Sequence, residues 1–125
     1  MKLSVPFYAN PDGVHCLQAC LKMVLKYFDP DKDYTWKELD KISAKKENKW
    51  TWPTATLLFL IKNGYQVEVV EDYDYQKFVE MGTAYQIEKY GKKVANEQIK
   101  NSDINQERLF MKEFLNIGKW QQRVP

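Results

Sequence analysis

The chain is 125 residues long, with 44% hydrophobic and 14% aromatic residues, which suits one packed domain and argues against disorder. Its 19 basic and 17 acidic residues give a net charge of +2, so no charge excess favours nucleic acid or an acidic membrane surface as a partner. No apolar run is long enough to span a bilayer, and the first residues lack the apolar centre of a signal peptide. We therefore expect a single cytoplasmic domain over residues 1–125 that binds neither nucleic acid nor membrane.

The first third of the chain predicts a turn followed by a long apolar helix. The run Asn10-Pro11-Asp12-Gly13 has proline at the second position and glycine at the fourth, which favours a type I turn. Between Cys16 and Phe28 the polar residues recur every four positions and all others are apolar, so we expect a central, buried helix. The polar residues of this helix are Gln18, Lys22 and Lys26.

Start and stop signals place the following elements. Thr35, with Glu38 three residues later, forms a capping box and predicts a helix to about Ser43. Pro53 predicts the start of the next helix, which Asn63-Gly64 ends. A strand is expected over 65–70. Further helices are expected after 72–74 (with Phe78, Val79 and Met81), over 83–90 and 92–101, and over 106–116 with Leu109, Phe110, Phe114 and Leu115 facing inward.

These signals predict five or six helices with one or two short strands, a mainly α (α+β) class. The end of the chain, over 120–125, carries no clear signal. One strand cannot form a sheet. The chain is therefore either an all-α domain with one extended segment, or a domain whose other strands lie elsewhere.

The few cysteine and histidine residues limit which disulfides and metal sites the chain can form. The only such residues are Cys16, Cys20 and His15. Two cysteines four residues apart on one helix are usually too far apart for an unstrained disulfide. Two thiols and one imidazole, without a second cluster downstream, do not make a zinc site. We expect neither a metal nor a cofactor.

Cys16 is the candidate nucleophile. It stands at the predicted start of a helix, where free amide groups and the helix dipole favour a thiolate. The alternative is a small core residue, as free cysteines often are. Cys20, one turn later among apolar residues, is expected in the core.

Two residues near Cys16 have a functional and a structural interpretation. Adjacent helical residues point about 100° apart, so His15 is expected as a surface or capping residue rather than as the base. Asn10, six residues before Cys16, could donate its side-chain amide to an oxyanion. Asn10 equally favours the turn before Pro11, and the spacing alone does not decide between the two roles.

Together these residues resemble the opening of a known family. Val5-Pro6-Phe7-Tyr8, Asn10, Cys16 and the run from Ala19 to Phe28 are similar to the start of papain-like cysteine peptidases of the bacteriocin-processing (double-glycine leader peptidase) type. In that family a Val-Pro-aromatic strand precedes an oxyanion glutamine, and the nucleophilic cysteine follows six residues later. The segments 50–53, 64–67 and 72–78 resemble the middle of uncharacterised members.

The resemblance implies that Cys16 is the nucleophile and that Asn10 replaces the oxyanion glutamine, while Leu17 replaces the usual glycine. The family's catalytic histidine lies on a strand in the second half of the domain, and no histidine follows His15 here. A segment like 119–125 leads into that sheet in the family. We therefore expect the helical lobe of a papain-like fold, an incomplete domain that is either truncated or encoded separately.

Two functions follow as expectations. The first is a cysteine peptidase-like thiol hydrolase that acts on a peptide, with Cys16 and Asn10 in its site, and that is catalytically incomplete or a pseudoenzyme. The alternative is a non-catalytic, peptidase-derived helical module that binds a peptide or a partner protein. An unpaired apolar face would favour a homodimer or a partner.

Overall fold

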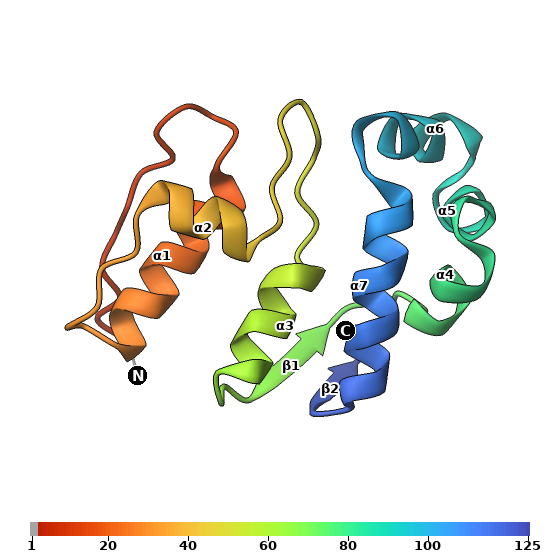
Figure 1. Cartoon of the computed structure of the whole chain (residues 1–125). Coiled ribbons are helices and arrows are strands. Elements are labelled where there is room, and N and C mark those ends of the chain that lie inside the picture. The colour runs from red at the N-terminus through yellow and green to blue at the C-terminus, as the bar shows by residue number, and fades with distance from the viewer. Residues whose placement is uncertain (1–2) are drawn as a thin grey trace.

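The computed structural model describes residues 3–125 and is mainly helical (Figure 1). Both short helices expected between residues 83 and 101 form, so the seven helices of the described chain exceed the five or six expected. None of the helices within residues 3–125 combines the length and the apolar character needed to cross a bilayer. The elements are α1 Cys16–Phe28, α2 Trp36–Ile42, α3 Thr54–Lys62, β1 Val67–Val70, α4 Tyr75–Met81, α5 Thr83–Tyr90, α6 Lys92–Asn101, α7 Ile104–Ile117 and β2 Trp120–Arg123.

Capping side chains fix where several helices begin. The Thr35 hydroxyl accepts a hydrogen bond from the Glu38 backbone N–H at 3.1 Å, and the Glu38 carboxylate accepts from the Thr35 N–H in return. This confirms the predicted capping box. Asp74 caps α4 and Asp103 caps α7 by accepting from the N–H of the residue three positions later. Local signals therefore determine these helix starts.

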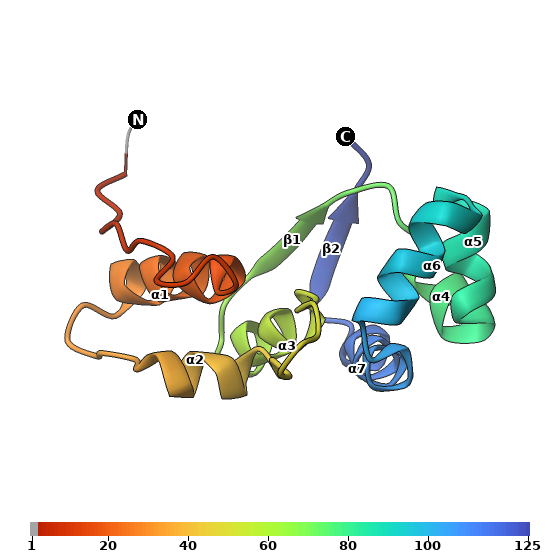
Figure 2. The same ribbon diagram turned by 90° about the horizontal axis from the view of Figure 1, so that it is seen from above.

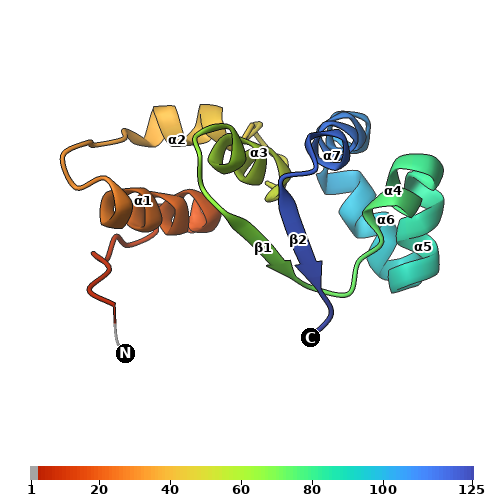
Figure 3. The same cartoon turned by 90° about the horizontal axis from the view of Figure 1, so that it is seen from below.

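The two strands form a parallel pair, with Val67 opposite Trp120 and Val70 opposite Arg123 (Figure 3). Trp120 anchors the second strand: its ring stacks on Phe114 with centroids 4.1 Å apart, and its Nε1 donates to the Phe114 carbonyl at 2.8 Å. The segment without a sequence signal is thus a strand held by a residue of α7.

The larger core lies between α3, α4, α5 and α7. Phe78 and Phe114 are fully buried at its centre, and Met111 lies beside them. Leu109 was expected to face inward, but this is wrong: it is 69% exposed. It stands two positions from Met111 and therefore on the opposite side of α7.

A smaller core joins α1 to α2 at one end of the molecule, with α3 and the strands between this pair and α4–α6 (Figures 1 and 2). Leu21 and Leu25 of α1 pack against Leu39 of α2, and all three are buried. This pair of helices carries Cys16 at its edge, so its packing decides how that thiol is presented.

The burial predicted for α1 is confirmed only in part, because Leu21 and Leu25 are buried but the helix is not covered on all of its apolar sides. The helix has the expected bounds, but its polar side faces α2 and the chain before it, while an apolar stripe is left open. Lys22 Nζ donates to the Tyr34 carbonyl at 2.6 Å, and Lys26 pairs with Asp33 at 2.7 Å. Cys20, expected in the core, is exposed. The exposed stripe consists of Cys16, Cys20, Val24 and Phe28, which are successive residues at a spacing of four.

Candidate functional site

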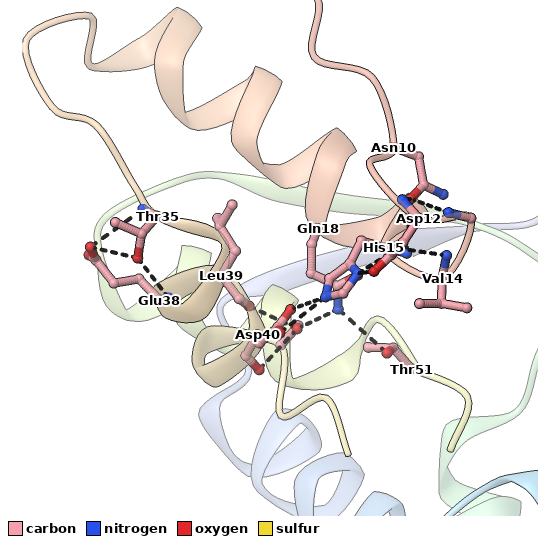
Figure 4. A network of polar contacts seen from close by, with 12 residues as sticks. Asn10, Asp12, Val14, His15, Gln18, Thr35, Glu38, Leu39, Asp40 and Thr51 are labelled. Carbon is pink, nitrogen blue, oxygen red and sulfur yellow. Dashed lines mark hydrogen bonds and ion pairs between the residues drawn. The ribbon is translucent and has the colours of Figure 1, made fainter. Parts of the chain in front are cut away.

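The turn before α1 is closed by the side chain of Asn10. Its Oδ1 accepts hydrogen bonds from the N–H groups of Gly13 at 3.0 Å and His15 at 3.1 Å (Figure 4). Gly13 has a φ of +79°, a conformation that glycine adopts without strain. The chain therefore bends here around a side-chain oxygen, a role that asparagine commonly plays, and not around the backbone hydrogen bond typical of the expected type I turn. Asn10 keeps its amide nitrogen for another partner.

Cys16 is the first residue of α1, and its side chain is exposed. No side chain among residues 3–125 caps this helix, so the first amide groups of α1 are not taken by a capping group. A cleft of about 900 Å³ lies in front of it, between the residues that open α1 and the loop over 45–51. The thiol is thus accessible from the cleft and lies at the positive end of a helix dipole.

The far wall of this cleft is basic and is tied to the rest of the molecule. Lys45, Lys46 and Lys49 line it, together with Trp50, which is 49% exposed. Lys46 forms an ion pair with Asp103, and the Trp50 N–H donates to the carbonyl of the last residue of α6 at 2.6 Å. The loop is therefore held in place by α6 and the start of α7.

His15 is held between two carboxylates. Its Nδ1 lies 2.8 Å from Asp12, and its Nε2 lies 2.9 Å from Asp40 of α2 (Figure 4). The hydrogen bond that Asp12 accepts from the ring, followed by the one that Asp40 accepts, raises the pKa of His15 above its ordinary value of 6.5. The same contact lowers the pKa of Asp12. Because both ring nitrogens are engaged, neither is free to take a proton from a thiol.

Gln18 links α1 to α2 beneath the cleft. Its side chain is 1% exposed, and its Nε2 donates to Ser43 Oγ at 2.8 Å. Ser43 Oγ donates in turn to the Leu39 carbonyl at 2.9 Å. The amide oxygen of Gln18 has no hydrogen-bond partner in the described chain. The sequence pattern placed Gln18 on a polar stripe and gave no sign that this stripe is the one that meets α2.

A second, smaller cavity of about 240 Å³ lies under α5 and α6. Its polar groups bond to one another: the Tyr73 hydroxyl donates to Gln86, and Gln86 Nε2 donates to Gln98 at 2.9 Å. These three side chains are therefore engaged with one another, and the described residues that line the cavity include neither a cysteine nor a histidine. The cleft at Cys16 is the stronger candidate site.

The structure brings both predicted site residues, Cys16 and Asn10, to the same junction of turn and helix. It also adds Asp12, Asp40 and Gln18, which bond to or support that junction. Only the cysteine and the asparagine carried a signal in the sequence. Within residues 3–125, histidine, cysteine and carboxylate side chains do not gather in groups of three that could hold a metal ion.

Comparison of the chain with models of protein families, with curated proteins and with solved structures gave no match.

Proposed function

We propose that this chain is a cysteine peptidase-like domain in which Cys16 is the nucleophile. The observation that carries the proposal is the exposed thiol at the first residue of α1, facing a cleft of about 900 Å³. Nucleophilic cysteines occur in such positions because the amide groups and dipole of a helix start stabilise the thiolate. The resemblance of the first 28 residues to bacteriocin-processing peptidases supports the same role, with a peptide as substrate.

Asn10 supplies the oxyanion donor in this proposal. The N–H groups that bond to its Oδ1 fix the plane of the side-chain amide, so that Nδ2 also has a fixed direction. A fixed amide donor can stabilise negative charge on a substrate oxygen. On this proposal both interpretations that the sequence allowed apply: the oxygen of Asn10 shapes the turn, and its nitrogen is assigned to the site, although Asn10 itself does not line the cleft.

The general base is the missing part. His15 is the only histidine of the sequence, and Asp12 and Asp40 occupy both of its ring nitrogens. In the proposal the base comes from outside this chain, either from a further segment of a longer protein or from a partner chain. A cysteine nucleophile without its base retains little activity, so we expect negligible peptide hydrolysis by residues 1–125 alone.

The two cysteines provide a matched test of the nucleophile, because both are exposed and lie one turn apart on the same helix. We expect Cys20→Ser to react with iodoacetamide at close to the wild-type rate at about pH 7. Cys16→Ser should lose most of the reaction, because only Cys20 remains. Equal rates in the two variants would refute a special reactivity of Cys16.

A second function is favoured by the exposed apolar stripe on α1. Val24 and Phe28 are 38% and 62% exposed, and Phe7 in the preceding segment is 81% exposed. An exposed apolar surface of this kind marks a site of protein association. On this account the chain is a non-catalytic module that binds a partner protein, in the simplest case a second copy of itself.

Sedimentation at micromolar concentrations separates this second function from the first. If the stripe joins two copies, the wild type should dimerise, and Val24→Glu should be monomeric because it places a charge in the interface. Leu109→Glu is the matched control, because Leu109 is also exposed but lies on α7. A monomeric wild type, or equal dimerisation of both variants, would refute the homodimer.

A further inference from the structure

His15 joins three parts of the molecule that meet at Cys16. Its N–H donates to Asn10 Oδ1 in the turn, and its carbonyl accepts the first hydrogen bond of α1, from the Ala19 N–H at 2.8 Å. Its ring reaches Asp40 on α2, which is 25 residues away in the chain. The residue next to the candidate nucleophile therefore fixes the turn, the helix start and the neighbouring helix to one another.

The bridge between the two carboxylates requires a charged ring. A neutral imidazole carries one N–H, whereas the imidazolium carries two and can donate to Asp12 and Asp40 together. The side chain of His15 is 14% exposed, and the edge of Trp36 packs against it with ring centroids 6.0 Å apart. The other nearby charge is Lys45, which acts on Asp12. The arrangement is thus a partly buried cation held by two anions.

We propose that His15 is a positioning residue for Cys16: clamped between Asp12 and Asp40, its imidazolium holds the start of α1 against α2 and offsets one of the two carboxylate charges that flank this helix start. The inference rests on the proposed role of Cys16 as nucleophile. It gives the histidine a part other than that of the base, since both ring nitrogens are already engaged.

The clamp, by which we mean the His15 ring bonded to both Asp12 and Asp40, depends on pH in a defined direction. The carboxylates raise the pKa of His15 above 6.5, so the bridge is complete below that pH and is lost as pH rises through the raised value. The lowered pKa of Asp12 keeps its carboxylate charged down to values below 3.8. The clamp therefore operates between the lowered pKa of Asp12 and the raised pKa of His15.

The test compares the rates at which iodoacetamide alkylates Cys16 and Cys20 within one molecule, measured by mass spectrometry of the digested protein. We expect His15→Gln to lower the Cys16-to-Cys20 ratio at about pH 6 by about threefold, because Asp12 and Asp40 are then left without their counter-charge at the start of α1 and disfavour a thiolate there. His15→Arg keeps a cation with several donors and should restore part of the ratio. Asp33→Asn is the control, because it removes an ion pair at the other end of α1.

Asp40→Asn provides a second variant that retains the shape of the clamp and an acceptor oxygen for Nε2. We expect it to lower the pH midpoint of the His15 ring, followed by NMR. At a pH between the midpoints of the variant and the wild type it should also lower the Cys16-to-Cys20 ratio, because both proteins then carry the same net charge at this site but only the wild type keeps His15 bonded to both side chains. A shifted midpoint with an unchanged ratio would overturn the role of His15. A wild-type ratio near one refutes the nucleophile itself, whereas a high ratio in the wild type and in both His15 variants refutes only the positioning role.

Discussion

His15 Nε2 lies 3.1 Å from Asp40 Oδ2, so the residue before Cys16 is hydrogen-bonded to the last turn of α2. The opposite ring nitrogen is bonded to Asp12 in the turn before α1. These two contacts, with the buried bond from Gln18 to Ser43 below them, hold the candidate nucleophile in a defined place. A thiol on a frayed helix end would lack the fixed geometry that nucleophilic catalysis requires.

The stability of the protein should depend on His15 in a pH-dependent way. Because the pKa of His15 is raised in the folded state, its contribution is complete below 6.5 and disappears as pH rises through the raised value. His15→Gln should therefore destabilise the protein more in mildly acidic than in alkaline solution, as measured by urea unfolding over a series of pH values.

Asp33→Asn is again the control for this measurement. The pKa of Asp33 is lowered by Lys26, so its contribution is constant above its ordinary value of 3.8 and should not change in the range where His15 titrates. A His15→Gln effect that is equally independent of pH would contradict the clamp.

Glu107 of α7 should make the protein less stable at high pH. Burial raises the pKa of this carboxyl from 4.5 to about 7, and its Oε2 has no hydrogen-bond partner in the described chain. Its protonated form therefore stabilises the fold fully below 4.5, and this contribution is lost as pH rises through about 7. The whole effect amounts to about 3 kcal/mol at most.

Glu107→Gln should leave stability nearly unchanged at low pH and raise it relative to the wild type above the raised pKa, because the amide stays neutral. Denaturant unfolding at several pH values measures the crossover. Glu113→Gln, on the same helix but at a position that is 48% exposed, is the matched variant. Parallel pH curves for Glu107→Gln and the wild type would be the contrary result.

Phe114 should be one of the most costly residues to truncate. It is fully buried in the larger core and stacks on Trp120, so it supports both α7 and β2. We expect Phe114→Ala to reduce the free energy of unfolding by about 3–5 kcal/mol. Leu109→Ala, on the exposed side of the same helix, should change it by about 0.5 kcal/mol or less. Similar losses in thermal or denaturant unfolding would contradict the orientation of α7.

Helix positions were predictable because their signals are local. The capping box at Thr35, the glycine after Asn63 and the cap at Asp74 each involve residues within one turn of one another. The bounds of α1 followed in the same way from the apolar run between Cys16 and Phe28. Such signals say where an element begins and ends, but not which side of it is covered.

Which side of α1 is exposed was not predictable, because this depends on the segments that pack against the helix. Three polar residues on a mostly apolar helix normally mark the solvent side. Here Gln18 donates a hydrogen bond to Ser43, Lys22 donates one to a backbone carbonyl, and Lys26 forms an ion pair with Asp33. The polar side of α1 is therefore covered by the rest of the chain. None of these partners could be read from the spacing within the helix.

The remaining features depend on residues far apart in the sequence. The second strand forms because Trp120 pairs with Val67 and stacks on a residue of α7. The contact between His15 and Asp40 likewise requires α1 and α2 to be packed first. Sequence analysis could therefore identify Cys16 and Asn10 as candidates, but not the ion pairs that surround them.

The most direct test of the proposed nucleophile is a competition between Cys16 and Cys20 in the folded and the unfolded chain. Both thiols of one sample are labelled with limiting iodoacetamide at about pH 7, and the labelled fraction of each is measured by mass spectrometry. We predict that Cys16 is labelled several times faster than Cys20 in the native protein and at an equal rate in urea. Equal labelling in the native protein would contradict the proposal that the start of α1 activates Cys16.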